Sequence, residues 1–205
     1  MKTTRHLKML LLFVLLGAGL GLSAQTHVYI TGSDTGSDQQ PPSGTPSANI
    51  VSTFRDAIVR ANNLSGQVIV HLRTNNLSET QSCTVNSGKN VQVINDTGVR
   101  KAIRYSTAAY QTTSRLIAVN GGTLTFGGEG CTGELIIRAQ PYDPYYYPTA
   151  DTALRVLVKV VSNSVLNIED NCEICYGKDN IWIKFRWTFV FKYKSRISNV
   201  WMNFM

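Results

Sequence analysis

The side chains with the clearest capacity for chemistry are the carboxylates between residues 129 and 173. Clustered Asp and Glu side chains carry out acid–base and hydrolytic chemistry on polysaccharides. Glu169 and Asp170 are adjacent, so on a strand they would point to opposite faces, and turn residues surround them. The spacing therefore predicts solvated turn carboxylates and no catalytic residue. The whole set is Glu129, Glu134, Asp143, Asp151, Glu169, Asp170 and Glu173.

Histidine and cysteine offer little more chemistry. His27 and His71 lie in strand-like sequence, and no Gly-x-Ser-x-Gly motif supplies a nucleophile for them. Cys172 and Cys175 form a Cys-x-x-Cys pair, but a zinc site needs a second pair of ligands, which the sequence lacks. We therefore expect no metal and no cofactor. We interpret the cysteines as small buried residues or as disulfide partners; they are Cys83, Cys131, Cys172 and Cys175.

One aromatic segment, residues 141–148, is a candidate binding element. It holds four Tyr and three Pro in eight residues. Proline restricts the backbone, and tyrosine offers a rigid apolar face with a hydroxyl group. The segment predicts stacking on sugar rings or contact with a host or cell-surface protein, and its alternative is an ordinary insertion whose rings cover the side of the fold. The candidate binding residues are Tyr142, Tyr145, Tyr146 and Tyr147.

The elements that must position these residues include an internal repeat. Residues 116–128 align without a gap on residues 158–170, at an offset of 42. Each copy predicts two short strands joined by a polar turn, and a repeated unit of this kind is typical of a β-solenoid. We expect two coils of ~21 residues in each copy. The aligned apolar pairs are Leu116 with Val158, Val119 with Val161, Leu124 with Leu166, and Phe126 with Ile168.

One helix and a series of short strands complete the predicted domain. Over residues 53–62 the apolar side chains share one stripe, Ser52 or Thr53 can cap the helix, and Asp56 falls in its first turn. Turn residues rich in Gly, Asn and Ser separate the strands that follow. The predicted strands span 26–31, 67–72, 80–85, 90–94, 102–105, 115–119, 123–126, 134–138, 154–161 and 165–168.

This order of elements resembles right-handed parallel β-helix proteins of the pectate-lyase-like class. In many secreted bacterial members, a segment like Phe54–Asn62 precedes a strand like Val68–Leu72. The resemblance covers residues 50 to about 175. It implies an all-β fold, a right-handed parallel β-helix or β-solenoid, short in this chain, whose open N-terminal end is capped by the helix. Members that cleave polysaccharides use clustered carboxylates, sometimes with calcium; no motif here allows such a residue to be carried over.

Both ends of the chain differ from the repeat body. Residues 1–25 combine three basic residues with an apolar run, which predicts a cleaved secretory signal peptide. Residues 180–205 lack Gly, Pro and acidic residues, and over 183–194 aromatic residues alternate with mainly basic ones, which predicts an amphipathic strand. The net charge is +7, but three basic residues lie in 1–25 and five in 180–205, so the body is nearly neutral and nucleic-acid binding is not expected.

The sequence thus predicts four parts: a signal peptide (1–25), an N-terminal strand and loop (26–49), a β-helix domain (50–179) and an aromatic-basic tail (180–205). We expect a secreted or outer-surface protein of bacterial type that serves as a non-catalytic adhesion or as a glycan- or protein-binding module. One alternative is a carbohydrate-active β-helix lyase or hydrolase. A second is a truncated or frameshifted fragment of a longer surface protein, with a tail that is not native. A further, less favoured hypothesis is that the tail (180–205) contacts a membrane.

Overall fold

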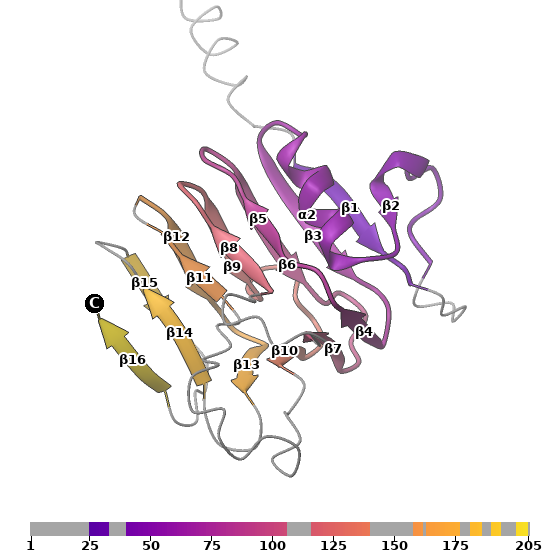
Figure 1. Ribbon diagram of the computed structural model, residues 1–205. Helices are drawn as coiled ribbons and strands as arrows, with labels where there is room; N and C mark the ends of the chain where they lie inside the picture. The colour runs from indigo at the N-terminus through magenta and orange to yellow at the C-terminus, as the bar shows by residue number, and fades with distance from the viewer. Residues whose placement is uncertain are drawn as a thin grey trace, which may run out of the picture.

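The computed structural model describes residues 25–32, 40–105, 116–139, 158–161, 163–176, 181–185, 190–193 and 200–204. Among these residues the chain is mostly parallel β-sheet with little helix, which confirms the expected dominance of strands (Figure 1). Residues 1–24 of the predicted signal peptide and the whole Tyr-Pro segment (141–148) lie outside the described residues. No helix in the described part is long and apolar enough to cross a membrane.

The largest sheet, called sheet A, has the strand order β15-β12-β9-β6-β3-β1-β2. Its strands are parallel, and from β3 to β15 each neighbour lies three strands further along the chain. The strands are β1 (Thr26–Ile30), β2 (Ile50–Val51), β3 (Gln67–Leu72), β6 (Asn90–Ile94), β9 (Thr123–Phe126), β12 (Val165–Ile168) and β15 (Val190–Tyr193).

Two smaller parallel sheets follow the same progression, except for the step from β14 to β16, which is two strands. Sheet B has the order β13-β10-β7-β4, and sheet C has the order β16-β14-β11-β8-β5. Sheet B contains β4 (Asn76–Glu79), β7 (Lys101–Tyr105), β10 (Leu135–Ala139) and β13 (Cys172–Tyr176). Sheet C contains β5 (Cys83–Val85), β8 (Ile117–Val119), β11 (Val158–Val160), β14 (Ile181–Phe185) and β16 (Val200–Phe204).

The core lies between the sheets because alternate strand residues are apolar and face inward. In β3, Val68, Val70 and Leu72 are almost completely buried, and aliphatic residues of β1 and of the strands from β4 to β13 join them in one cluster. Each such side chain contributes roughly 1.5–3 kcal/mol when it is fully buried. The stack of parallel strands therefore rests on one continuous apolar interior.

The predicted helix is confirmed as α2 (Phe54–Asn62), which follows the short 3₁₀ helix η3 (Ser47–Asn49). Thr53 is its N-cap residue, and its hydroxyl accepts a hydrogen bond of 3.0 Å from the amide of Asp56. The apolar stripe is completely buried in the shared core; its members are Phe54, Ala57, Ile58 and Ala61.

Strand pairing confirms the repeat, but it corrects the alignment of the two copies and the number of coils in each copy. After the turn the offset is 42, since Leu166 pairs with Leu124, whereas before the turn Val158 pairs with Ile117, an offset of 41. The turn between β11 and β12 is therefore one residue longer than the turn between β8 and β9. The expectation of two coils per copy is also wrong, because β12 pairs directly with β9.

The predicted strands have counterparts in the described segments, with shifted ends. The expected strand at 80–85 starts only at Cys83, and β4 (Asn76–Glu79) was not predicted. The tail differs more: the single strand expected over 183–194 is two strands, β14 in sheet C and β15 in sheet A. A change of sheet between them explains why one uninterrupted strand cannot form.

Candidate functional site

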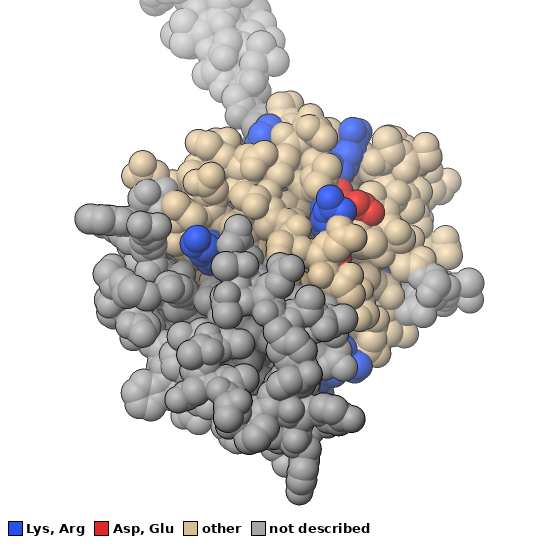
Figure 2. All heavy atoms as spheres, viewed as in Figure 1, with Lys and Arg blue, Asp and Glu red and all other residues tan. Residues whose placement is uncertain are grey.

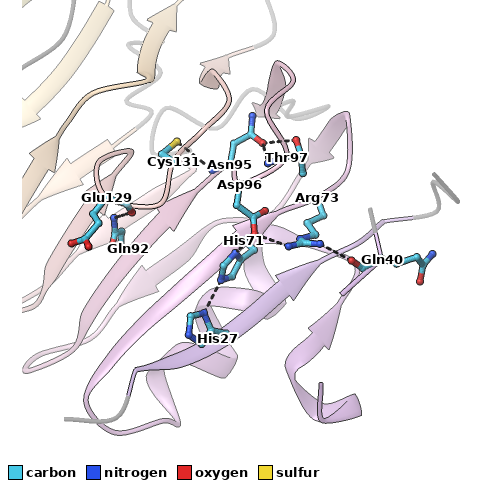
Figure 3. Close-up of polar contacts among 10 residues, drawn as sticks. All are labelled: His27, Gln40, His71, Arg73, Gln92, Asn95, Asp96, Thr97, Glu129 and Cys131. Atoms are coloured by element: carbon cyan, nitrogen blue, oxygen red, sulfur yellow. Dashed lines mark hydrogen bonds and ion pairs between the residues drawn. The ribbon is translucent and has the colours of Figure 1, made fainter. Parts of the chain in front are cut away.

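Two histidines lie in contact on the outer face of sheet A (Figure 3). The sequence did not predict that they would be partners. His27 comes from β1 and His71 from β3. These strands pair in register, with Tyr29 opposite His71. Because Val28 and Val70 face the core, the alternating residues His27, Tyr29 and His71 project from the opposite face.

A carboxylate completes the arrangement. Asp96 follows β6, and its Oδ2 lies 2.8 Å from Nδ1 of His71. His71 Nε2 lies 2.8 Å from Nδ1 of His27. A carboxylate only accepts hydrogen bonds, so Nδ1 of His71 donates to Asp96. In the neutral ring Nε2 then accepts the hydrogen bond that Nδ1 of His27 donates. We call Asp96, His71 and His27 the histidine relay.

Arg73 binds the same oxygen of the Asp96 carboxylate as His71 does. Its Nη2 lies 2.6 Å from Oδ2 of Asp96, and its Nη1 donates a 2.6 Å hydrogen bond to the backbone oxygen of Gln40. The guanidinium lies 5.2 Å from the ring centre of Tyr29, in a cation–π contact. The Tyr29 ring in turn stacks on His71 at 4.4 Å between centroids. The relay is thus fixed by contacts from several chain segments.

The surroundings of these side chains lower the pKa values of Asp96 and His27 and raise the pKa of Tyr29. Burial by itself would raise the pKa of Asp96, but hydrogen bonds from His71 and Arg73 outweigh it and lower that pKa to about 2. Burial lowers the pKa of His27, and the neighbouring His71 lowers it further. Burial raises the pKa of Tyr29. The relay therefore holds an ionised carboxylate on one side of His71 and, on its other side, a His27 ring that resists protonation.

A row of hydrogen-bonded amides lies beside His27 on the same face of sheet A. Gln25 donates through Nε2 to Oε1 of Gln67 at 3.2 Å, and Gln67 donates to Gln92 at 3.4 Å. Gln92 Nε2 also donates to the backbone oxygens of Gly127 and Glu129, at 2.9 and 3.0 Å. We call Gln25, Gln67 and Gln92 the amide row.

Sheet B carries a separate, basic pocket on its surface. It has a volume of about 240 Å³ and no acidic residue in its lining. Arg104 Nη2 donates to Asn76 Oδ1 at 2.7 Å, while the buried Nε of Arg104 has no hydrogen-bond partner among the described residues. Lys101 is buried and donates to Asn75 at 2.9 Å. The lining residues are Asn75, Asn76, Arg100, Lys101, Ala102, Arg104, Ile136 and Arg138.

Register explains how the sequence builds this pocket. Arg138 in β10 pairs with Arg104 in β7, and Ile136 pairs with Ala102. Both arginines therefore occupy the same row of one sheet face, about 4.8 Å apart in backbone spacing. Arg100 lies just before β7 and forms an exposed ion pair of 3.1 Å with Glu134. A positive surface of this kind attracts anionic ligands.

The predicted carboxylates do not form a described cluster. Glu134 pairs with Arg100, whereas Glu169 and Asp170 lie in the turn between β12 and β13. The amide of Gly128 donates to the backbone oxygen of Asp170, which ties this turn to its counterpart in the first repeat copy. Asp143 and Asp151 lie outside the described residues. Within the described segments, no group of three or more His, Cys, Asp and Glu side chains could hold a metal ion.

Of the predicted cysteine and tyrosine candidates, some lie in the described residues and others do not. Cys83, Cys131 and Cys172 are buried, and burial raises the pKa of the Cys131 thiol. Cys175 lies in β13, and its side chain is outside the described set. The four candidate tyrosines, Tyr142, Tyr145, Tyr146 and Tyr147, lie outside the described residues.

Comparison with known proteins supplies no identification: no family model, no curated protein and no solved structure matches this chain. Function must therefore be argued from the two sites themselves.

Proposed function

We propose that this protein is an exported, right-handed parallel β-helix of the cell surface that binds acidic glycans without cleaving the glycan chain. The basic pocket on sheet B carries the proposal. It combines arginine guanidinium groups with asparagine amides and has no carboxylate in its lining. Guanidinium groups bind carboxylate and sulfate groups through paired N–H donors, while amides suit sugar hydroxyls.

The arrangement of the strands supports the part of this proposal that concerns the β-helix fold. In each of the three parallel sheets, strands recur every third position from β3 to β14. A chain that returns to the same sheet after three strands is what a solenoid requires. The helix α2 packs on the core at the N-terminal end of the strand stack (Figure 1). There it serves as the cap that protects apolar surface and free strand edges.

The geometry of the pocket favours a charged ligand over a neutral one. Arg104 Nε is buried without a hydrogen-bond partner, and an unsatisfied buried donor costs roughly 1–3 kcal/mol. Burial closes this atom to a ligand, but the positive charge of the arginines that line the pocket attracts an anionic group. At about 240 Å³ the pocket is smaller than common small-molecule sites of roughly 300–1,000 Å³. It suits one charged sugar unit of a longer chain.

Binding to defined polysaccharides tests this function. The purified chain is titrated with polygalacturonate and with a neutral polymer, dextran, and the two affinities are compared. We expect binding to polygalacturonate alone, and loss of that binding in Arg104→Gln and Arg138→Gln. Lys159→Gln, which changes a cation on sheet C, is the matched control and should bind as the parent does. Equal affinity for both polymers would overturn the charge-based argument.

Separate experiments test the absence of glycan cleavage and the export of the protein. Release of unsaturated or reducing sugars from the polymer, with or without calcium, would replace the binding module by the alternative of a glycan-cleaving enzyme. The mature N-terminus of the exported protein tests the signal peptide, since cleavage is expected next to the small residues Ser23 and Ala24. A reading frame with further repeats downstream of the stop codon would favour the truncated-fragment alternative.

The Tyr-Pro segment is proposed as an additional contact region. Tyr145, Tyr146 and Tyr147 offer adjacent aromatic faces on which sugar rings stack. Changing all three to Ala is expected to weaken binding to glycans or cells. Unchanged binding would leave the basic pocket as the one proposed contact.

A further inference from the structure

The histidine relay on sheet A plays no part in glycan binding at the basic pocket, which lies on sheet B. Its three side chains come from segments that are far apart in sequence, at residues 27, 71 and 96. They form one continuous hydrogen-bonded line from a carboxylate to a partly exposed ring, visible in Figure 3. A line of this kind can move a proton.

We propose that Asp96, His71 and His27 form a proton relay in which Nε2 of His27 is a general base, and that it activates water for hydrolysis of an acyl ester on a carbohydrate held along the amide row. His71 engages both ring nitrogens, one with Asp96 and one with His27. His27 uses only Nδ1 in the relay. Nε2 of His27 is thus the atom that can accept a proton from a substrate.

The chemistry balances without any further reactant. Water gives a proton to Nε2 of His27 as its oxygen bonds to the carbonyl carbon, and the carbonyl electrons move to oxygen. The proton on Nδ1 of His27 passes to Nε2 of His71. The tetrahedral intermediate then breaks its bond to the alcohol oxygen, the relay returns its proton to that oxygen, and an acid and an alcohol are released. His27 ends the cycle neutral.

The relay stabilises the charge that this reaction creates. When the proton has moved, the positive charge lies on His71, 2.8 Å from the Asp96 carboxylate. The His71 side chain is only 8% exposed and that of Asp96 18%. Charges in a partly buried pair attract more strongly than they do in water. The low basicity of His27 before reaction keeps its ring neutral and ready near pH 7.

In the described part of the chain, the charged and titratable groups that face the relay are consistent with this role. From β1 come His27 and Tyr29, and after β3 comes Arg73, which binds Oδ2 of Asp96, the same oxygen that His71 binds. Arg73 thus neutralises part of the carboxylate charge but leaves the line to His27 open. Gln92 is buried and uses both amide N–H groups on backbone oxygens, whereas Gln25 and Gln67 each donate one N–H within the row. Their second N–H group is the donor offered to a sugar hydroxyl next to His27. An acylated sugar is therefore the matching substrate class.

Hydrolysis of para-nitrophenyl acetate by the purified chain tests the proposal. The rate should exceed that of free imidazole at equal concentration and should rise with pH as His27 loses its proton. His27→Gln should lower the rate by ~10²-fold or more, as expected for loss of a general base. A rate in His27→Gln equal to that of the parent would overturn the proposal, and so would a parent rate no higher than that of imidazole.

Positioning is tested separately from catalysis. Asp96→Asn can present an N–H to His71 and reverse its tautomer, so we expect a lower rate together with a shifted pH profile. Arg138→Gln, in the basic pocket, should keep the full ester-hydrolysis rate while it loses polygalacturonate binding. This control separates failure of the relay from failure of the glycan-binding proposal.

Nitrogen NMR of the unmodified protein decides the outcome if a variant does not fold. We expect both neutral rings to carry the proton on Nδ1, which leaves Nε2 of His27 unprotonated near pH 7. A proton on Nε2 of neutral His27 would overturn the proposal.

Discussion

Replacing Asp96 by asparagine should lower the stability of the fold at neutral pH. Hydrogen bonds from His71 and Arg73 outweigh burial and bring the pKa of this carboxyl to about 2, against 3.8 for the unperturbed group. One pKa unit corresponds to about 1.4 kcal/mol, so the folded state gains about 2 kcal/mol from ionised Asp96. The side chain is only 18% exposed, so solvent screens little of this gain.

The sign of the pH dependence follows from the lowered pKa. The stabilisation is present in full above about pH 5, where the carboxyl is ionised in both the folded and the unfolded state, and it is lost progressively as the pH falls towards about 2. At about pH 7, Asp96→Asn should lower the melting temperature by roughly 4–8 °C, given 2–4 °C per kcal/mol for a chain of this size. At about pH 2 the two melting temperatures should approach each other.

Thermal unfolding followed by circular dichroism measures both values. Asp170→Asn, which changes an exposed turn carboxylate, is the matched control and should alter the melting temperature little. The reasoning is refuted if Asp96→Asn costs nothing at neutral pH, or if its cost is the same at about pH 7 and pH 2.

Three further predictions concern the helix, a turn and a thiol. Thr53→Ala removes the N-cap of α2 and should lower the free energy of unfolding by about 1 kcal/mol in a urea titration; an unchanged midpoint would contradict the assigned cap. Gly122→Ala places a Cβ 2.5 Å from the backbone oxygen of Asn86 and should cost roughly 1–3 kcal/mol, and a fully stable variant would show that the turn has room. Burial raises the pKa of Cys83, so a thiol reagent should label it only after unfolding; rapid labelling of the native chain would argue against its burial.

The helix and most strands could be predicted because their patterns are local. The apolar stripe of α2 and the alternation in β3 are visible within a few residues of sequence. The strand β4 was missed because its sequence, Asn-Leu-Ser-Glu, favours a turn. Its Glu79 is buried and accepts hydrogen bonds from the amides of Arg55, Thr80 and Gln81. Tertiary contacts of that kind overrule local preference.

Neither site could be predicted in full, because register between distant strands determines both. His27 and His71 are 44 residues apart and His71 and Asp96 are 25 apart, and no local motif links them. The repeat contained a partial signal for register, but the extra residue between β11 and β12 hid the one-residue change of offset. Arg104 and Arg138 likewise come together only through strand pairing.

The most direct test of the proposed function is the salt dependence of polygalacturonate binding, measured by calorimetry. For the parent chain we predict binding that weakens steeply as salt rises from about 0.01 to 0.15 M, because screening shortens the reach of the pocket's arginine charges. The double variant with Arg104→Gln and Arg138→Gln should show little binding at either concentration. Binding by that variant as tight as the parent's would contradict the account.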